Sequence, residues 1–152
     1  MFTLFNVVSS DGFIARIDGS EDFIPDDVWP IFLELCTAYG TIIMGRKTYE
    51  AIQSYGKELR QPFDNLPVTK IVISNNRNLP LKKGYTLALS PQEAFAQAPN
   101  SLVSSGPGLN NQLLEDKLVE KIIIYQVPVS IKEGLAPFAK DMISEIPINY
   151  IS

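Results

Sequence analysis

Short apolar runs alternate along the chain with longer segments of mixed polarity. The first run, Phe2–Val8, is rich in aromatic and β-branched residues and ends at the turn signal Ser9-Ser10-Asp11-Gly12. This pattern predicts a buried strand. Further strands are predicted at residues 41–44, 69–74, 85–89, 101–104, 121–129 and 147–151.

Helices are predicted between these strands. Residues 26–39 are expected to form one helix, because Pro25 precedes them, acidic residues suit the positive end and Gly40 can stop it. Ser90 and Pro91 supply an N-cap and a first-turn proline for another helix, over residues 91–98. Two more helices are expected at residues 46–54 and 109–116, and the polar segment 56–66 is expected to be a loop.

The alternation predicts an α/β/α three-layer fold, with a mostly parallel mixed sheet and antiparallel strands at its C-terminal end. No repeat or long linker divides the chain, so residues 1–152 are expected to form a single domain. In such sheets, ligands bind beyond the carboxyl ends of the strands. Polar motifs follow four strands, at residues 9–12, 45–48, 74–77 and 104–108, and predict a crevice for a long ligand with several phosphates.

Composition narrows the function classes. Apolar residues make up 45% of the 152 positions, as in an ordinary globular protein, and the net charge of −4 disfavours nucleic acid as a partner. Cys36 is the single cysteine, so no intrachain disulfide can form and a reducing, cytoplasmic location is expected. The chain has no histidine, which removes the commonest general base and nearly all zinc sites, so no metal is expected. No apolar run reaches membrane-spanning length.

Gly45, Arg46, Lys47 and Thr48 stand where a strand meets a helix. Backbone N–H groups, a positive helix end, two cations and a hydroxyl meet there, which suits a bound phosphate. Taken alone, the motif fits a solvated helix start about twice as well, because short motifs give many false matches.

A second junction, Ser104–Leu109, contains Gly106, Pro107 and Gly108, and its glycines would let a pyrophosphate approach the backbone. An ordinary turn explains it about equally well. At the third junction, Ser74 and Asn75 lead to Arg77, which could hold a ribose 2′-phosphate, although an Asx turn with a solvent-facing arginine is the simpler interpretation.

Asp27 is the candidate acid. It lies in the first turn of a predicted helix, after the apolar pair Phe23-Ile24, and apolar walls can raise the pKa of a carboxyl group. The neighbouring Asp26 is interpreted as a partner of the helix dipole. Cys36 is interpreted as a small core residue, because it has helical spacing with other apolar residues.

Together these motifs resemble the dihydrofolate reductase-like superfamily, and most closely the reductase domain of the riboflavin-biosynthesis deaminase–reductase and its stand-alone relatives. The resemblance covers nearly the whole chain. It is carried by the order and spacing of motifs at residues 10–15, 45–50 and 105–107, and by Pro128-Val129, Gly134 and Pro137-Phe138.

The resemblance implies NADPH as hydride donor, a small heterocyclic substrate and a homodimer. By position it assigns cofactor binding to Ser10, Asp11, Gly12, Ala15, Gly45, Arg46, Lys47, Thr48, Ser74, Asn75, Arg77, Gly106, Pro107, Gly108 and Leu109. It assigns the substrate to Asn6, Asp27 and Tyr125, with Asp27 as the catalytic carboxylate.

Two departures from the family pattern bear on function. Ser105 replaces one of two paired glycines, so its side chain could crowd the diphosphate. Tyr125 stands where folate reductases have a small hydroxyl, which disfavours folate. Lys57 and Arg60 are weak candidates for holding a substrate phosphate.

The resulting hypothesis is an NADPH-dependent reductase of the riboflavin type, which transfers hydride to a ribosylaminopyrimidine. The alternatives are a dihydrofolate or other pterin reductase and, from another class, a nucleotide-binding paralogue without turnover. The sequence leaves open the substrate, the oligomeric state and whether the chain is catalytically active.

Overall fold

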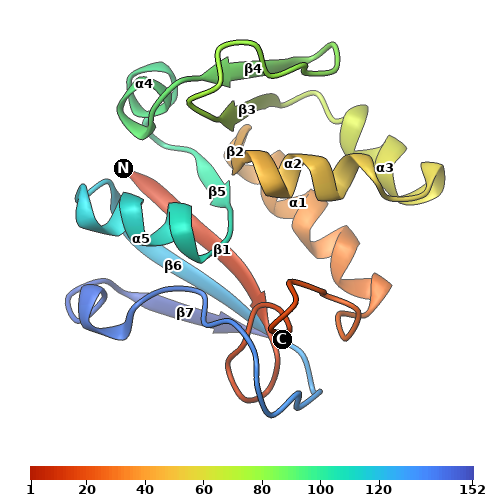
Figure 1. Cartoon of the computed structure of the whole chain (residues 1–152), viewed down its shortest axis with the longest axis vertical. Helices are drawn as coiled ribbons and strands as arrows, with labels where there is room; N and C mark the ends of the chain where they lie inside the picture. The colour runs from red at the N-terminus through yellow and green to blue at the C-terminus, as the bar shows by residue number, and fades with distance from the viewer.

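Seven strands form one sheet in the computed structural model, which describes residues 1–152 (Figure 1). The strands are β1 (Phe2–Val8), β2 (Thr41–Gly45), β3 (Thr69–Ile73), β4 (Tyr85–Ala88), β5 (Leu102–Ser104), β6 (Val119–Gln126) and β7 (Ile148–Ile151). Their order across the sheet is β4-β3-β2-β5-β1-β6-β7, and every neighbouring pair is parallel. All seven predicted strands are therefore present.

The helices are α1 (Trp29–Tyr39), α2 (Arg46–Gln53), α3 (Lys57–Asp64), α4 (Pro91–Gln97) and α5 (Pro107–Glu115), with short 3-10 turns η1 (Asp26–Val28) and η2 (Lys140–Met142). The four predicted helices are confirmed, except that the first begins as η1. None of the helices combines the length and the apolar character needed to cross a membrane.

The predicted loop at residues 56–66 is wrong, because α3 occupies most of it. The segment is polar and contains Pro62, so it shows little helical signal. Phe63 is nonetheless fully buried, and the ammonium of Lys70 donates to the carbonyls of Asp64 (3.3 Å) and Leu66 (2.8 Å) at the end of the helix. Tertiary contacts stabilise this helix more than its own residues do.

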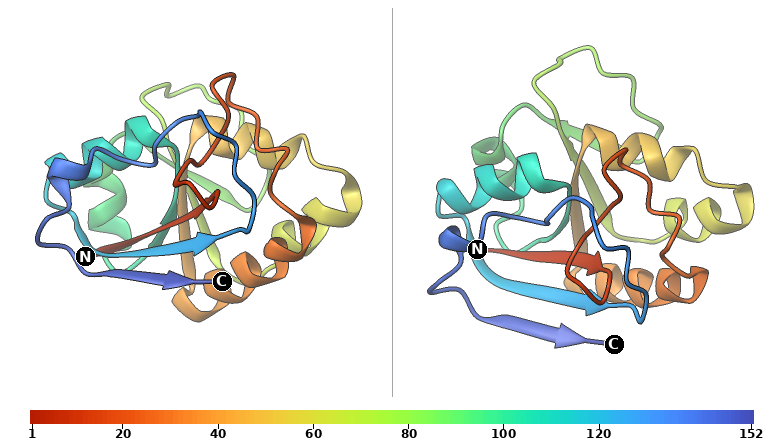
Figure 2. Two further views of the ribbon diagram at one scale, coloured as in Figure 1. Left: turned by 90° about the horizontal axis from the view of Figure 1, so that it is seen from below. Right: turned by 60° about the horizontal axis from the view of Figure 1, so that its bottom comes forward.

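Alternating side chains place two cores on opposite faces of the sheet. Ile43 and Ile71 belong to one core, together with residues of α4 and α5. Their neighbours Ile42 and Val72 belong to the other, which includes Phe32 and Cys36 of α1. The left view of Figure 2 shows α1 and α5 on opposite sides of the sheet, which makes the fold three-layered.

The predicted antiparallel strands at the C-terminus are wrong, because β7 runs parallel to β6. Residues 127–147 return from the carboxyl end of β6 to the other end of the sheet before β7 begins, so both strands enter from the same side (Figure 2). A tight hairpin would have reversed the direction. β7 is an edge strand whose Tyr150 is 66% exposed, and the homodimer stays a prediction.

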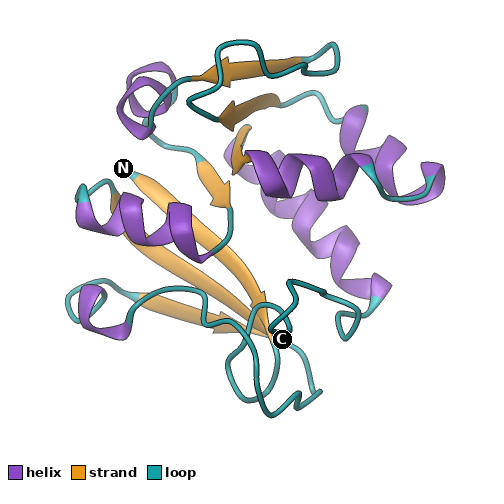
Figure 3. Ribbon diagram, in the orientation of Figure 1, coloured by secondary structure: helices purple, strands orange, loops and turns teal.

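Two long loops lie together at the carboxyl ends of β1 and β6 (Figure 3). Ile14 N–H donates to the Leu135 carbonyl, and Leu135 N–H donates to the Ala15 carbonyl. Gly134 is required there, because a β-carbon would collide with the Ala15 carbonyl oxygen. These contacts hold the first loop at the rim of the sheet.

Candidate functional site

A cavity of about 1230 Å³ opens at the carboxyl ends of β1, β2, β3 and β5. Pockets for one small ligand usually span about 300–1000 Å³, so there is room for a long ligand or for two ligands. We divide its wall into two parts. The basic half comprises Gly45–Thr48, Ser74, Asn75 and Ser104–Leu109, and the acidic half comprises Gly19–Asp22, Ile24–Asp26, Trp29, Phe32, Tyr55 and Leu59.

Helix α2 connects the two halves. Arg46 begins it in the basic half, and Tyr55 follows its end in the acidic half. At 1.5 Å per residue these positions lie about 13 Å apart along the helix axis. Gly45 and Leu109 are close, since a β-carbon on Gly45 would lie 3.5 Å from the Leu109 Cδ2 atom. The two helix starts of the basic half therefore adjoin each other.

The starts of α2 and α5 have no side-chain cap. Gly45 precedes α2 and Gly106 precedes α5, and no side chain accepts a hydrogen bond from the first N–H groups of either helix. By contrast, the Ser90 hydroxyl accepts from Glu93 N–H at the start of α4. Open N–H groups with a positive helix end suit an anion.

Arg46 and Lys47 are exposed at the same place and are the cations of the cavity wall. Arg46 forms a surface pair with Glu50 at 2.6 Å, and Lys47 has no ion-pair partner. A β-carbon at Gly106 or Gly108 would meet nothing within 4 Å, so the backbone there faces open space. The basic half therefore fits a diphosphate.

A buried polar network supports the basic half. The Ser105 hydroxyl donates to Asn110 Oδ1 (2.5 Å), and Asn110 Nδ2 donates to Asn6 Oδ1 (3.0 Å) and to the Pro137 carbonyl (2.9 Å). Asn6 Nδ2 in turn donates to the Ser105 carbonyl (2.9 Å). The Ser105 side chain thus turns toward Asn110, which gives no support to the idea that it crowds a diphosphate.

Aromatic side chains form the wall of the acidic half. The Trp29 ring lies 5.4 Å from the Phe32 ring and 5.5 Å from the Tyr55 ring, centroid to centroid. The Trp29 indole N–H donates to the Leu59 carbonyl of α3 at 2.7 Å. These contacts fix flat, apolar surfaces beside which a planar ring can pack.

Glu21 is the unusual acid of this half. Its carboxylate has no ion-pair or hydrogen-bond partner, and the protein packed around it raises its pKa, although the residue as a whole is exposed. The pKa of the Tyr55 hydroxyl is raised mainly by burial of Tyr55 and also by the negative charge of the nearby Glu21 carboxylate. A carboxyl group that is protonated closer to neutrality can donate a proton.

The other two carboxylates of the acidic half differ from Glu21. Asp22 pairs with the Arg16 guanidinium at 2.5 Å, and this hydrogen bond lowers the pKa of Asp22. Asp26 is exposed and has no ion-pair partner.

Twelve of the residues assigned from the sequence line this one cavity, although they come from four separate strand ends. They are Asn6, Ala15, Gly45, Arg46, Lys47, Thr48, Ser74, Asn75, Gly106, Pro107, Gly108 and Leu109. The predicted crevice at the carboxyl ends of the strands is therefore present.

Ser10, Asp11 and Gly12 lie outside the cavity. The Asp11 carboxylate instead accepts hydrogen bonds from Ser9, from Ser130 and from the Lys132 N–H. These hydrogen bonds lower the pKa of Asp11 strongly, and the bond from Ser9 has the largest effect. They tie the two long loops together, and the contact of Asp11 with a nicotinamide stays a prediction.

Arg77, Asp27 and Tyr125 also lie outside the cavity wall. Arg77 is exposed beyond the turn that follows β3. Asp27 is exposed on η1, where the next residue, Val28, faces the cavity. Tyr125 packs beside apolar residues of β6 and lines a separate shallow depression with Ser10 and Ser152. They do not line this cavity, and the roles inferred for them from sequence stay predictions.

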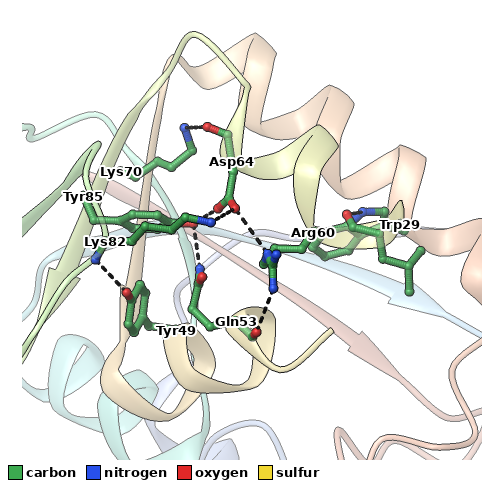
Figure 4. Close-up of polar contacts among 9 residues, drawn as sticks. Trp29, Tyr49, Gln53, Arg60, Asp64, Lys70, Lys82 and Tyr85 are labelled. Atoms are coloured by element: carbon green, nitrogen blue, oxygen red, sulfur yellow. Dashed lines mark hydrogen bonds and ion pairs between the residues drawn. The ribbon is translucent and has the colours of Figure 1, made fainter. Parts of the chain in front are cut away.

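Arg60 is held away from the cavity by a cluster around Asp64 (Figure 4). The Asp64 carboxylate accepts from Lys82 (2.7 Å) and Tyr85 (2.7 Å) and pairs with Arg60 Nε at 3.5 Å. Burial would raise the pKa of Asp64, but the bonds from Lys82 and Tyr85 outweigh it and lower that pKa. Arg60 and Lys57, the weak phosphate candidates, are both absent from the cavity wall.

Sequence reasoning missed most of the acidic half. Glu21 stands in a stretch interpreted as loop, Trp29 and Tyr55 carry no motif, and Leu59 falls in the misassigned helix. The only signal in the sequence was that the single tryptophan, Trp29, follows four acidic residues between positions 21 and 27. No group of three or more His, Cys, Asp or Glu side chains is placed to hold a metal ion.

Comparison with known proteins bears on the fold. No protein-family model matches the chain, and no curated protein matches its sequence. Among solved structures, a riboflavin biosynthesis protein from Shewanella sp. PV-4 superposes on this chain with a TM-score of 0.66. The two sequences are 22% identical, and the match covers 91% of this chain and 83% of that one.

Two further structures match in the same way. Dihydrofolate reductase from Enterococcus faecalis, in complex with NADP(H) and RAB-propyl, gives a TM-score of 0.65 at 16% identity, over 90% of this chain and 76% of that one. A deaminase/5-amino-6-(5-phosphoribosylamino)uracil reductase from Thermotoga maritima gives 0.63 at 15% identity, over 90% of this chain. This chain spans 47% of that longer protein. The chain therefore has the dihydrofolate reductase-like fold that these three structures share.

Proposed function

We propose that this chain is an NADPH-dependent reductase of a small heterocycle. One observation carries the proposal: two uncapped helix starts and two cations meet in the same cavity as a carboxyl group, that of Glu21, which has no partner and a raised pKa. The first set suits the phosphates of a dinucleotide, and the second suits proton donation. The NADP(H) complex of the structurally similar folate reductase agrees with this assignment.

The basic half would hold the cofactor. Arg46, Lys47 and the open N–H groups of α2 and α5 would bind its phosphates, and Ser74 and Asn75 would meet the adenosine ribose. When bound, NADPH supplies a hydride. The protein's part is to bind, to orient and to exclude water.

Glu21 would supply the proton that accompanies the hydride. Its pKa is raised by the protein packed around it, so a larger fraction is protonated near neutral pH than for a carboxyl group with its ordinary pKa. Solvent at the cavity mouth would restore the proton. Asp27, the acid expected from sequence, is not on the wall, and Glu21 takes its place in this proposal.

A ribosylaminopyrimidine, as in the riboflavin-type reductases of this fold, is the first substrate candidate, and a pterin such as dihydrofolate is the second. Both are planar rings that suit the Trp29, Phe32 and Tyr55 wall. The binding-only alternative rested on Ser105, whose hydroxyl turns to Asn110.

Calorimetric titration with NADPH and NADH, followed by measurement of NADPH oxidation with each heterocycle, tests the proposal. We expect saturable NADPH binding below about 100 μM, about 5 kcal/mol or more of binding free energy. We also expect NADPH consumption with at least one candidate. Binding no tighter than millimolar, or tight binding without turnover on any ring, would contradict the reductase assignment.

A further inference from the structure

Charge is divided sharply along the cavity. Its cations, Arg46 and Lys47, both lie in the basic half at the start of α2. Its carboxylates, Glu21, Asp22 and Asp26, all lie in the acidic half. Arg46 and Tyr55 lie about 13 Å apart along the axis of α2, so the two cations and the aromatic wall of the acidic half stand at opposite ends of this helix.

No other cation lines the acidic half. The Arg60 guanidinium pairs with Asp64 and donates to the Gln53 carbonyl at 3.3 Å, and the close-up shows it turned into that cluster (Figure 4). The Arg16 guanidinium pairs with Asp22. Lys57 begins α3 but is not on the wall.

The remaining surface of the acidic half is flat and apolar. Trp29, Phe32 and Tyr55 offer ring faces, and Leu59 and Ile24 complete the wall. Two carboxylates on this wall, those of Glu21 and Asp26, have no ion-pair partner, and in their ionised form they can accept hydrogen bonds from a bound ring. Such a surface favours ring N–H and amino donors, and it repels phosphates and carboxylates.

We propose that the acidic half binds a planar nitrogen heterocycle that is neutral or cationic and carries no phosphate or carboxylate. This inference rests on the proposed reductase function and narrows its substrate class. Among ribosylaminopyrimidines it selects the riboside over the ribosyl phosphate, and among pterins it selects forms without an acidic tail.

Matched ligand pairs test the inference directly. One pair is a diaminouracil riboside and its ribosyl phosphate, and the other is methylpterin and pterin carboxylate. Binding is followed by quenching of Trp29, the single tryptophan of the chain, at low and high salt. We expect the uncharged member of each pair to bind at least about tenfold more tightly, with a smaller difference at high salt.

Variants then assign the discrimination to named carboxylates. The double change Glu21→Gln and Asp26→Asn should reduce the difference to about threefold or less, because it removes the repulsion. Asp27→Asn, one residue further along and outside the cavity, is the matched control and should leave the difference intact. Equal or tighter binding of the anionic members by the unaltered protein would overturn the inference.

NADPH affinity is measured on the same samples, so that the two proposals fail separately. Normal NADPH binding without charge discrimination would contradict the substrate class alone. Charge discrimination without NADPH binding would show that the cavity binds uncharged heterocycles as ligands, and it would contradict the reductase function.

Discussion

The two halves of the cavity are built in different ways. The basic half comes from junctions where a strand passes directly into a helix, at Gly45–Thr48 and Ser104–Leu109, and a buried network through Asn110 fixes the second junction. The acidic half is assembled from a long loop, from one face of α1 and from the far end of α2. The first is a property of local sequence, and the second exists only after folding.

The difference also shows in how polar groups are paired. Asn110 and Ser105 have hydrogen-bond partners, whereas Glu21 has none. Buried polar groups with partners contribute to stability, and an acid with a shifted pKa and no partner in a cavity is a candidate for chemistry. This comparison assigns positioning to the basic half and reactivity to the acidic half.

The largest effect is expected for Glu21→Gln. Loss of the proton donor should lower kcat by about 10²–10³-fold, the usual range for general acid catalysis. The Kd for NADPH should change less than about twofold, because the basic half is untouched. Steady-state kinetics and calorimetry measure the two quantities, and equal losses in both would show that the halves are not separable.

The pH profile sharpens the assignment of Glu21. Since the reaction uses the protonated form, kcat should be constant at low pH and fall as pH rises through the raised pKa of Glu21. Glu21→Gln should abolish this limb. The free energy of unfolding should also fall as pH rises, because the folded protein holds the proton of Glu21 more tightly than the unfolded chain does. The contribution is present below the ordinary carboxyl pKa and is lost as pH rises through the raised one.

Asn110→Ala should be the most damaging change to the basic half. It leaves the Ser105 hydroxyl, Asn6 and the Pro137 carbonyl without their partner, at a cost of about 2–4 kcal/mol in the free energy of unfolding. Denaturant unfolding measures this loss. Asn78→Ala, at an exposed asparagine whose side chain forms no hydrogen bond, is the control and should change it by less than about 0.5 kcal/mol.

Asp64→Asn should weaken the acidic half indirectly. The Asp64 cluster anchors α3, and α3 holds the Trp29 indole through the Leu59 carbonyl. We expect about 1–2 kcal/mol of lost stability at neutral pH. The loss should shrink as pH falls, because the stability that Asp64 contributes is fully present above the ordinary carboxyl pKa and is lost as pH falls through its lowered pKa.

Thermal unfolding across pH checks this prediction, with the exposed Asp141→Asn as control. NADPH affinity should stay within about twofold of the unaltered protein. A larger loss of NADPH affinity than of ring binding would contradict the placement of the cluster behind the acidic half.

Lys47→Met should have the smallest effect, about a tenfold increase in the Kd for NADPH, as expected for one charge-assisted contact to phosphate. The loss should diminish at high salt. Lys83→Met removes an exposed cation distant from the cavity wall and should leave the Kd unchanged. If both variants behave alike, the effect is one of net charge and not of the basic half.

The basic half could be predicted from the sequence, and the features that depend on tertiary contacts could not. Strand ends and glycine junctions were predicted because their signals are local, and twelve of the assigned residues line the cavity. Helix α3 was missed because Phe63 and Lys70 stabilise it through contacts outside the segment. The direction of β7 depends on the path of residues 127–147, which no local pattern records.

The sequence pointed to Asp27 as the proton donor, and Glu21 was missed, for a similar reason. Asp27 and Asp26 look alike in sequence, yet only Asp26 reaches the cavity wall, because a 3-10 turn sets which side chain faces inward. Glu21 gained its raised pKa from the protein packed around it, which is a tertiary effect. Asp11, which matches the family motif, joins two loops.

Energy transfer from Trp29 to reduced nicotinamide tests the central claim most directly, since the single tryptophan lines the acidic half and the proposed phosphate site lies in the basic half. Excitation of Trp29 during a titration with NADPH should give saturable nicotinamide emission, weakened in affinity by Lys47→Met but not by Asp27→Asn. Saturable NADPH binding without any change in Trp29 emission would place the cofactor elsewhere and contradict the account.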